Sequence, residues 1–406
     1  MKIAIQGALS RISETLSETL GHSVVGRQDA LDEFLRERWP KLSPLKSRLQ
    51  LLMVRNVLEP LVIQPYQRRM LPVLFGPIYF QALSAAVRFD LFTLLDQRGE
   101  LTLSEIAEAL EIDPKEARVL LDVLVTLGFI QKRPSEEASY YNHWLTKWYL
   151  SESSPLNIKA VVDWYHYICY KPMYHFFEAL KTGQNEGLVE IDGEGDTLYQ
   201  RLTQHPELER IFQKAMEQIS TSANRSLASY VDFSQVRSLV DVGGGNASNI
   251  IAIAQRNPHL RARIFDSPSV EKLAQENIQK AHLQDRLSTL RGDCFKDPYP
   301  QDADCFLYCH FLDIWSEEQN KFLINKTYQA LPAGGQIIIF DIMQRDDGKG
   351  PLTAVAGHPY FLTLATGQGF IYSAQEYESW LTEAGFTQIQ RLHLPQDHIA
   401  VIGHKA

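Results

Sequence analysis

After Phe233, short apolar runs alternate with longer segments in which apolar residues recur at helical spacing. The spacing predicts helices, most clearly over Ala247–Arg256 and Ser269–Ala281. The short runs predict six strands: Ser238–Val242, Ala262–Asp266, Leu287–Leu290, Asp304–His310, Gln336–Ile342 and Ile399–Gly403. Strands that alternate with helices indicate an α/β fold, a doubly wound, Rossmann-like sheet that binds its ligand at the carboxyl ends of the strands. We place this domain at residues 231–406.

The pattern over residues 73–230 predicts a mainly α-helical domain that begins with a winged helix. A long apolar helix over Ile78–Asp96 is followed by helical segments at Leu103–Leu110 and Ala117–Leu127. Two short runs flank the polar link Pro134–Ser139 and predict a hairpin, Phe129–Lys132 with Tyr140–Asn142. Helix, turn, helix and hairpin together outline a winged helix.

Leu156–Tyr230 is predicted to be mostly helical and contains a dense cluster of rings. They fall within fourteen residues, so one helix face cannot carry them all. Some are expected in the core, and others could line a pocket for a flat apolar ligand. We take five side chains as pocket candidates: Trp164, Tyr167, Tyr170 and Met173, with His358 from a later loop. Residues 1–72 show amphipathic helical segments with breaks at Gly26, Pro40, Pro44 and Pro60, and we expect a helical extension of open function.

Charge separates the possible partners. The chain of 406 residues has 40 Lys and Arg against 49 Asp and Glu, a net charge of −9. Between Gly99 and Leu127, in the winged helix, the sequence has seven acidic residues and only two basic residues. Phosphate would repel such a surface, so the winged helix is expected to serve dimerisation or to act as a lid. We expect a small-molecule substrate and a homodimer, with neither nucleic acid nor membrane as a partner.

Targeting and metal signals are also weak. Gln6 and Arg11 interrupt the first apolar stretch, so no secretory signal forms, and Met70–Val87 reads as a buried helix rather than a membrane span. The cysteines, Cys169, Cys294, Cys305 and Cys309, show neither CxxC pairing nor the spacing of metal ligands. We expect a cytoplasmic protein with no bound metal.

The sharpest chemical signal is a glycine-rich turn from a strand into a helix, Asp241-Val242-Gly243-Gly244-Gly245. Glycines let a ligand approach the backbone, and the following helix offers free N–H groups. A nicotinamide fingerprint would continue to a third glycine, but Ser248 stands there, which disfavours a nicotinamide oxidoreductase. Asp266 ends the next strand, 25 positions after Asp241, where a carboxylate can accept both hydroxyls of a ribose. Together these features favour a nucleoside cofactor.

From about Phe75 onward, the chain resembles the class I S-adenosylmethionine-dependent methyltransferases, specifically the small-molecule O-methyltransferases of the caffeic acid and hydroxyneurine type. The motifs that carry this resemblance are Asp241–Gly245, Phe265–Val270, Gly292–Phe295, Leu312–Glu318, Leu331–Gly335 and Leu381–Phe386. The resemblance implies S-adenosyl-L-methionine as cofactor and a winged helix used for dimerisation. It implies cofactor contacts from the glycine loop of Asp241, Gly243, Gly244 and Gly245, from Asp266 at the ribose, and from Asp293, Cys294, Cys309 and Trp315.

The chain departs from this family where the general base is expected. The family usually has His in a His-Asp-Trp triplet, and here Asp313-Ile314-Trp315 puts Asp313 at the His position. An Asp near its ordinary pKa is a weak base toward a phenol unless burial raises its pKa. Asp341, at the end of a late strand, matches one of two acids that often flank the His, whereas Ile371 holds the other position. His310 is a further candidate base.

We therefore predict methyl transfer from S-adenosyl-L-methionine to a small, aromatic or polyketide-like metabolite, on oxygen or on carbon, with Asp313, His310 and Asp341 as catalytic candidates. A carbon nucleophile or an acidic hydroxyl would need little help from a base. Two alternatives stay open at this stage. The bound cofactor could serve decarboxylation, hydroxylation or pericyclic chemistry, or the chain could be a winged-helix regulator that senses the cofactor.

Overall fold

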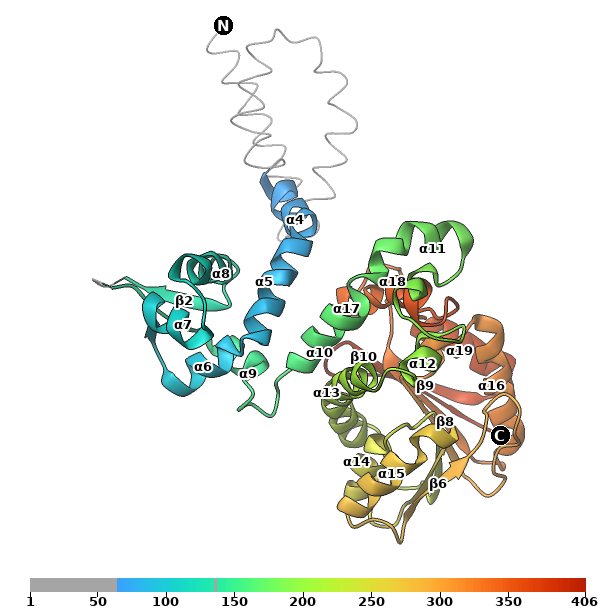
Figure 1. Cartoon of the computed structure of the whole chain (residues 1–406). Coiled ribbons are helices and arrows are strands. Elements are labelled where there is room, and N and C mark those ends of the chain that lie inside the picture. Colours follow the sequence, from blue (N-terminus) through green and yellow to red (C-terminus); the bar gives the residue numbers. More distant parts are fainter. Residues whose placement is uncertain (1–63, 135–136) are drawn as a thin grey trace, which may run out of the picture. The chain divides into compact units, whose positions relative to one another are not determined.

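A computed structural model describes residues 64–134 and 137–406 (Figure 1). The described residues up to Phe80 belong to one unit, and the described residues from Gln81 to Ala406 belong to a second. The helical segments predicted for residues 1–63, with their breaks, lie outside the described residues. The division at residue 80 gives no test of the predicted domain boundaries at residues 72 and 230, which stay predictions.

The long helix predicted over Ile78–Asp96 is wrong, because the chain bends within it. After α4 (Gln64–Leu74), α5 (Gly76–Arg88) ends and α6 (Leu91–Arg98) begins at an angle of 54°. Asp90 precedes α6 with a left-handed φ of 53°, which is outside the helical region. Within the described part of the chain, no single helix is long and apolar enough to cross a membrane, although α5 and α6 pass that test of length and composition as a bent pair.

The predicted winged helix is present. Strand β1 (Leu101–Thr102), helices α7 (Leu103–Leu110) and α8 (Pro114–Thr126), and strands β2 (Ile130–Arg133) and β3 (Ser139–Asn142) follow in order, and the three strands pair as β1-β3-β2. Thr102 and Glu105 form a capping box that starts α7, and Pro114 occupies the first turn of α8. Local capping chemistry therefore sets both helix starts. The short helix α9 (Trp144–Leu150) follows.

Residues 156–230 are mostly helical, as predicted, but the ring-rich part is broken into short pieces. Its elements are α10 (Lys159–Trp164), a π-helix (Tyr165–Cys169), a 3₁₀ turn (Pro172–His175), α11 (Phe176–Thr182), a second 3₁₀ turn (Glu186–Glu190), α12 (Leu198–Leu202) and α13 (Pro206–Tyr230). Because the helix type changes along this stretch, the rings point in different directions: Trp164 is buried, whereas Tyr167 and Tyr174 are exposed.

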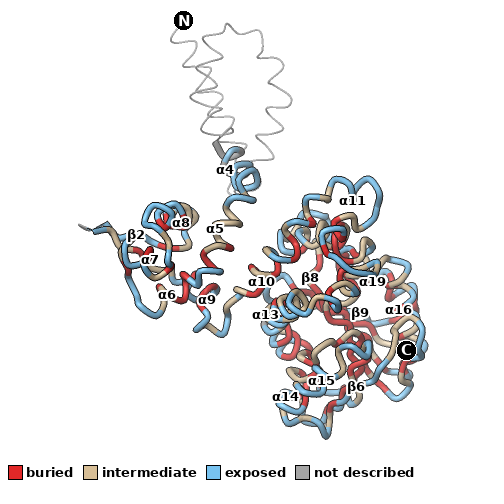
Figure 2. The backbone as a smooth tube through the Cα atoms, viewed as in Figure 1, coloured by how far each residue is buried: buried red, intermediate tan, exposed pale blue. Residues whose placement is uncertain are grey.

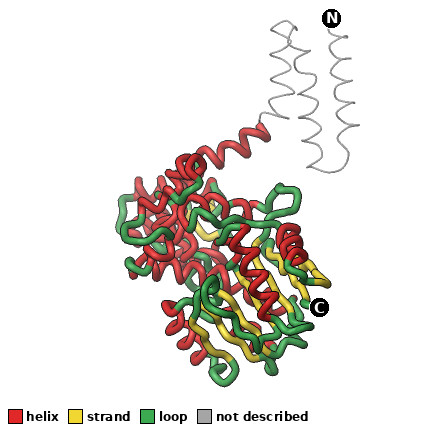
Figure 3. Tube along the Cα trace, turned by 90° about the vertical axis from the view of Figure 1, so that its right-hand side faces the viewer, coloured by secondary structure: helices red, strands yellow, loops and turns green. Residues whose placement is uncertain are grey.

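A seven-stranded sheet in the order β6-β5-β4-β7-β8-β10-β9 forms the centre of the C-terminal part (Figures 1 and 3). Its strands are β4 (Ser238–Val242), β5 (Arg261–Asp266), β6 (Leu287–Arg291), β7 (Cys305–Cys309), β8 (Gln336–Ile342), β9 (Thr387–His393) and β10 (His398–His404). Strands β4 to β8 pair in parallel, and β10 runs antiparallel to both β8 and β9. All six predicted strands are present within a residue or two. Strand β9 was missed because its mostly polar, half-exposed sequence gives no apolar run.

The connections contain the helices expected of a doubly wound sheet. These are α14 (Ser248–Arg256), α15 (Pro268–Lys280), α16 (Glu317–Ala330), α17 (Leu352–Val355), α18 (Gly357–Tyr360) with a π-helix (Phe361–Ala365), and α19 (Ala374–Glu383). Strand order reverses direction at β4 and β7, because β5 and β6 lie on one side of β4 while β8 lies beyond β7. Ligands bind at such a switch point, outside the carboxyl ends of the strands.

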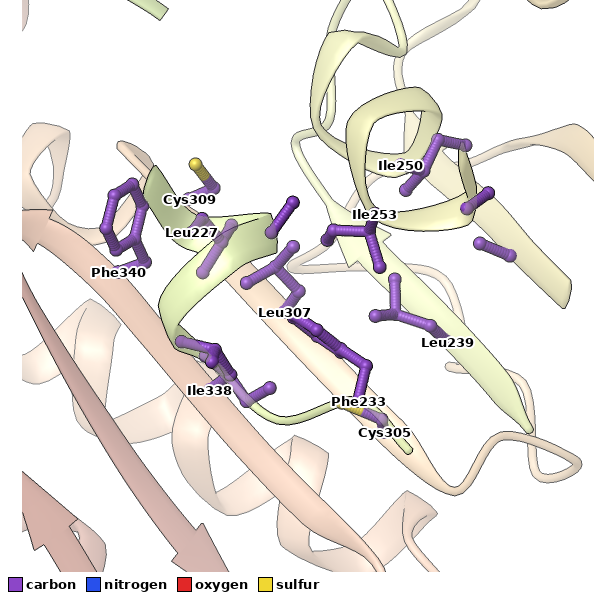
Figure 4. Close-up of a cluster of buried hydrophobic side chains, with 14 of the residues drawn as sticks. Leu227, Phe233, Leu239, Ile250, Ile253, Cys305, Leu307, Cys309, Ile338 and Phe340 are labelled. Carbon is purple, nitrogen blue, oxygen red and sulfur yellow. The ribbon is translucent and has the colours of Figure 1, made fainter. Parts of the chain in front are cut away.

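The core on one face of the sheet joins α13 to the strands. Leu227 of α13 and Phe233, which follows it, pack with Leu239, Leu307 and Phe340 from three adjacent strands, and all are buried (Figures 2 and 4). Truncating such a side chain to Ala typically costs about 2–5 kcal/mol. This packing holds α13 over the sheet, and α13 forms one wall of the site described next.

Candidate active site

A cavity of about 550 Å³ opens at the carboxyl ends of the central strands. Gly243 to Asn246, after β4, and Asp266, at the end of β5, line one part of it. Cys309 at the end of β7, His310 after it, Asp313, and Asp341 at the end of β8 line another part. One face of α13 also lines the cavity. The volume lies in the range of sites for small ligands and cofactors. The sheet topology therefore brings the strand-end residues of the sequence prediction together.

The glycine loop after β4 requires residues without a Cβ atom at two of its positions. Gly243 has a left-handed φ of 73°, and a Cβ there would overlap the ring of Phe311. A Cβ on Gly244 would lie 2.5 Å from Oδ2 of Asp241. Gly245 is also left-handed, with a φ of 53°, but faces open space. The backbone can thus approach a ligand closely just before α14 begins.

The two acids predicted beside this loop have different surroundings. Asp241 is fully buried beneath the loop, does not line the cavity, and accepts a hydrogen bond from Asn249 Nδ2 at 3.1 Å. Burial raises the pKa of Asp241 to about 8. Asp266 lines the cavity and accepts hydrogen bonds from the backbone N–H groups of Gly245 and Ser267, at 2.9 and 2.6 Å. Asp241 therefore supports the loop from below, and Asp266 stands where a ligand would contact it.

His310 and Asp341 form a close pair in the cavity wall. Nδ1 of His310 lies 3.3 Å from Oδ1 of Asp341, which is buried. The other ring nitrogen of His310, Nε2, is buried and makes no hydrogen bond within the described residues. His310 has a left-handed φ of 51°, which is uncommon for a residue other than glycine and often marks functional sites. An imidazole held by a carboxylate at one nitrogen has its second nitrogen available to take a proton.

Asp313 lines the same cavity in a different electrostatic setting. It is buried, and its Oδ1 finds no hydrogen-bond partner among the described residues. Burial, with the nearby charge of Asp341, raises the pKa of Asp313 well above its usual value. Two close carboxylates cannot both ionise readily, so the site favours a neutral carboxyl at Asp313 that can donate a hydrogen bond.

Besides Asp241, three residues expected at the cofactor do not line the cavity. Asp293 makes an ion pair with Lys296 at 2.9 Å, and the carbonyl oxygen of Cys294 accepts a hydrogen bond from Lys326. The ring of Trp315 packs against Phe295 and Phe311 with centroids 4.8 and 5.9 Å apart. Since Phe311 lines the cavity, Trp315 lies behind that wall. Cys309, by contrast, is buried and does line the cavity.

Of the substrate-pocket candidates, Trp164 alone lines the cavity. Tyr167 is exposed and lies under the guanidinium of Arg88, 6.0 Å from the ring centroid. Met173 packs against the helical core. The ring of His358 packs against Phe370 at an interplanar angle of 35°, and His358 accepts a hydrogen bond from the backbone N–H of Ile371. Tyr170 is half-buried outside the cavity wall.

Several wall residues were missed by the sequence analysis. They come from α12, α13 and the segment after α17, and include Tyr199, Glu209, Phe212, Gln213, Glu217 and Tyr360. The residues of α13 recur every three or four positions, so they share one face of that helix. This periodicity was readable in the sequence, but nothing there indicates which partner the face meets.

The cavity fits the cofactor that the resemblance implies. Its wall includes five acidic side chains, Glu209, Glu217, Asp266, Asp313 and Asp341, and no Lys or Arg among the described residues. A sulfonium and an amine are cationic, and carboxylates at an enclosed site favour them. Asp266 beside the glycine loop is suited to ribose hydroxyls. Among residues 64–134 and 137–406, no group of three or more His, Cys, Asp or Glu side chains could hold a metal ion.

Comparison with known proteins matches both parts of the chain. Residues 173–387 match the O-methyltransferase domain, and residues 71–152 match the O-methyltransferase dimerisation domain, which agrees with the charge argument for the winged helix. The L-tyrosine C(3)-methyltransferase of Streptomyces lavendulae is 36% identical over 80% of this chain and 88% of its own length. The tetracenomycin polyketide synthesis 8-O-methyl transferase TcmO of Streptomyces glaucescens is 31% identical over 80% of this chain and 93% of its own length.

A solved structure matches this chain at a similar sequence identity and coverage. The apo form of the S-adenosylmethionine-dependent methyltransferase SibL superposes with a TM-score of 0.73 at 36% identity, covering 84% of this chain and 99% of that one. With the glycine loop, the strand-end acids and the switch-point cavity, these matches show that the chain belongs to the O-methyltransferase family and is an enzyme with S-adenosyl-L-methionine as its cofactor.

Proposed function

We propose that the enzyme methylates a small phenolic metabolite and that His310, oriented by Asp341, takes the phenol proton. The observation that carries this proposal is the pair itself: Nδ1 of His310 lies 3.3 Å from Asp341, and its buried Nε2 has no partner among the described residues. If Nδ1–H donates to the carboxylate, Nε2 is left as the proton acceptor of a residue that lines the cavity. A positioned base of this kind contributes about 10²–10⁴-fold to a rate.

The proposal gives Asp313 a different task from the one its place in the motif implies. Its raised pKa favours a neutral carboxyl, which is a hydrogen-bond donor and not a proton acceptor. A neutral Asp313 can donate to the substrate oxygen while His310 removes the proton. The two side chains would then hold the phenol oxygen between them, and the rest of the wall positions the ring.

Once the proton has moved to His310, the phenolate shares its negative charge with the ring carbons next to it. When bound, the cofactor would supply the methyl group from its positively charged sulfur, and that sulfur would remain as a neutral thioether. We propose attack through the ring carbon beside the hydroxyl, because the relative at 36% identity is named as a C(3)-methyltransferase of tyrosine. The carbon–methyl bond forms as the carbon–sulfur bond breaks, which gives a neutral dienone. The dienone becomes a phenol again when His310 returns its proton to the oxygen and water takes the proton from the methylated carbon. O-methylation of the same phenol is the second candidate, favoured by the relative TcmO at 31% identity.

The test compares three variants with phenolic substrates and methyl-deuterated cofactor, with products analysed by mass spectrometry and NMR. We expect His310→Gln to lower kcat at least about 100-fold and Asp313→Asn to lower it by less. The control is His393→Gln, because His393 is exposed on β9 and absent from the cavity wall. If Asp313→Asn instead lost about 100-fold in kcat and His310→Gln kept full activity, Asp313 would be the general base.

Product analysis separates the remaining alternatives. A product with deuterium on a ring carbon supports C-methylation, and deuterium on oxygen supports the second candidate. Substrate that is altered without gaining the label would instead indicate non-methylation chemistry with bound cofactor.

We also propose that the enzyme works as a homodimer. The support is the match of residues 71–152 to the family's dimerisation domain, together with the acidic winged helix. Light scattering of the full chain is expected to give twice the mass of one chain, and a monomer mass would contradict the proposal.

A further inference from the structure

The α13 wall of the cavity offers a signal about the substrate's charge. Glu209, Gln213 and Glu217 recur every four residues and all line the cavity. They share one face of α13 with Phe212 and Met216, which line it too. Within the described part of the chain, neither glutamate side chain has an ion-pair partner. A polar, negatively charged stripe therefore runs along an otherwise apolar and aromatic wall.

The two glutamates serve different ends of the cavity. Asn224, further along α13, donates a hydrogen bond to Ser248 at 2.9 Å, where α14 begins after the glycine loop. Glu217 is thus the glutamate on the cofactor side. Two turns earlier, about 12 Å along the helix axis, Glu209 lies on the other side.

Aromatic residues of the wall link the α13 face that carries Glu209 to Asp313. Phe212, one turn from Glu209, packs against the ring of Tyr199 with centroids 5.9 Å apart. Tyr199 is close enough to Asp313 for that carboxyl to raise the pKa of the tyrosine, in addition to the effect of burial. Asp313 is itself more than nine-tenths buried, lines the cavity, and has an unpartnered Oδ1 among the described residues. That orphaned atom indicates that a polar ligand group belongs at this end of the path.

We propose that Glu209 binds an ammonium group at the far end of the phenolic substrate, so that the enzyme's substrates are phenolic amines. This inference rests on the proposed function: the phenol oxygen lies at His310 and Asp313, the ring lies along Tyr199 and Phe212, and the ammonium reaches Glu209. The aromatic rings of this wall favour a cation as well. No Lys or Arg lines the described cavity, so a substrate carboxylate has no cationic partner there.

Titration calorimetry on the full-length enzyme saturated with S-adenosylhomocysteine tests this. The probes are tyramine, its nearly isosteric neutral analogue 4-propylphenol, and the anionic 3-(4-hydroxyphenyl)propionate. Because a hydrogen bond to a charged group is stronger than a neutral one, we expect tyramine to bind at least about tenfold more tightly than 4-propylphenol. The propionate should bind most weakly.

Three variants locate the effect on α13. Glu209→Gln should remove most of the preference for tyramine and leave the affinity for 4-propylphenol unchanged. Glu207→Gln is the matched control, because Glu207 is exposed on the same helix and absent from the cavity wall. Glu217→Gln should weaken binding of S-adenosyl-L-methionine more than binding of tyramine.

The proposal is overturned if tyramine binds no more tightly than 4-propylphenol, if none of the three probes binds, or if Glu209→Gln keeps the preference. A different measurement would contradict the proposed function. His310 is tested by turnover of the neutral 4-propylphenol, to which Glu209 contributes nothing, so loss of the ammonium preference leaves that measurement intact.

Discussion

Adding one methyl group to the glycine loop tests how tightly the loop is packed against the cavity wall. In Gly243→Ala the new Cβ overlaps the ring of Phe311 and also sits on a left-handed backbone with φ of 73°. The left-handed conformation costs a non-glycine residue about 1–2 kcal/mol. Overpacking against a ring costs about 1–3 kcal/mol more. We therefore expect the free energy of unfolding to fall by about 2–5 kcal/mol.

Gly245→Ala is the matched comparison, since Gly245 is also left-handed but a Cβ there meets no atom within 4 Å. It should lose only the conformational part, about 1–2 kcal/mol. Urea denaturation followed by tryptophan fluorescence measures both variants without cofactor. Because displacement of Phe311 changes the cavity wall, Gly243→Ala should also weaken binding of S-adenosyl-L-methionine more than Gly245→Ala does. Equal destabilisation of the two variants would refute the clash between Gly243 and Phe311.

Three further predictions concern buried groups. The pKa of Asp241 is about 8 when folded and near 3.8 when unfolded, so the native state binds an extra proton between these values and its stability falls as pH rises from about 4 to 8. Asp241→Asn removes this dependence. In urea titrations, the free energy of unfolding of the variant should rise relative to that of the wild type by up to about 1.4 kcal/mol per pH unit in that window. Parallel pH curves for the two proteins would contradict this prediction. Asp266→Ala should weaken S-adenosyl-L-methionine binding at least about tenfold by calorimetry, because one charge-assisted hydrogen bond is lost, and an unchanged affinity would remove Asp266 from the cofactor site. Leu307→Ala, in the centre of β7, should lower the free energy of unfolding by about 2–5 kcal/mol in urea, and a loss below 1 kcal/mol would mean that the core is looser than described.

The features that the sequence predicted well are local ones. Apolar runs found β4 and β8 to the residue, and the glycine turn with Asp266 found the cofactor end of the cavity. Each signal is contained within one element or one turn, where period and backbone conformation leave a direct trace. The same reasoning failed for α5 and α6, because the apolar pattern continues through the left-handed Asp90. It also missed β9, whose residues are mostly polar.

The sequence by itself therefore determined the fold class, the cofactor loop and a set of acids at strand ends. Only the tertiary structure decided how those acids are used. The parallel register that pairs Cys309 with Phe340 brings His310 beside Asp341, although the two are far apart in the chain. Packing of α13 on the sheet turns Glu209 and Phe212 toward the cavity, while Asp293 and Trp315 remain outside it. The reason is physical: pairing across strands and burial between layers depend on contacts between distant residues, and local spacing does not record these contacts.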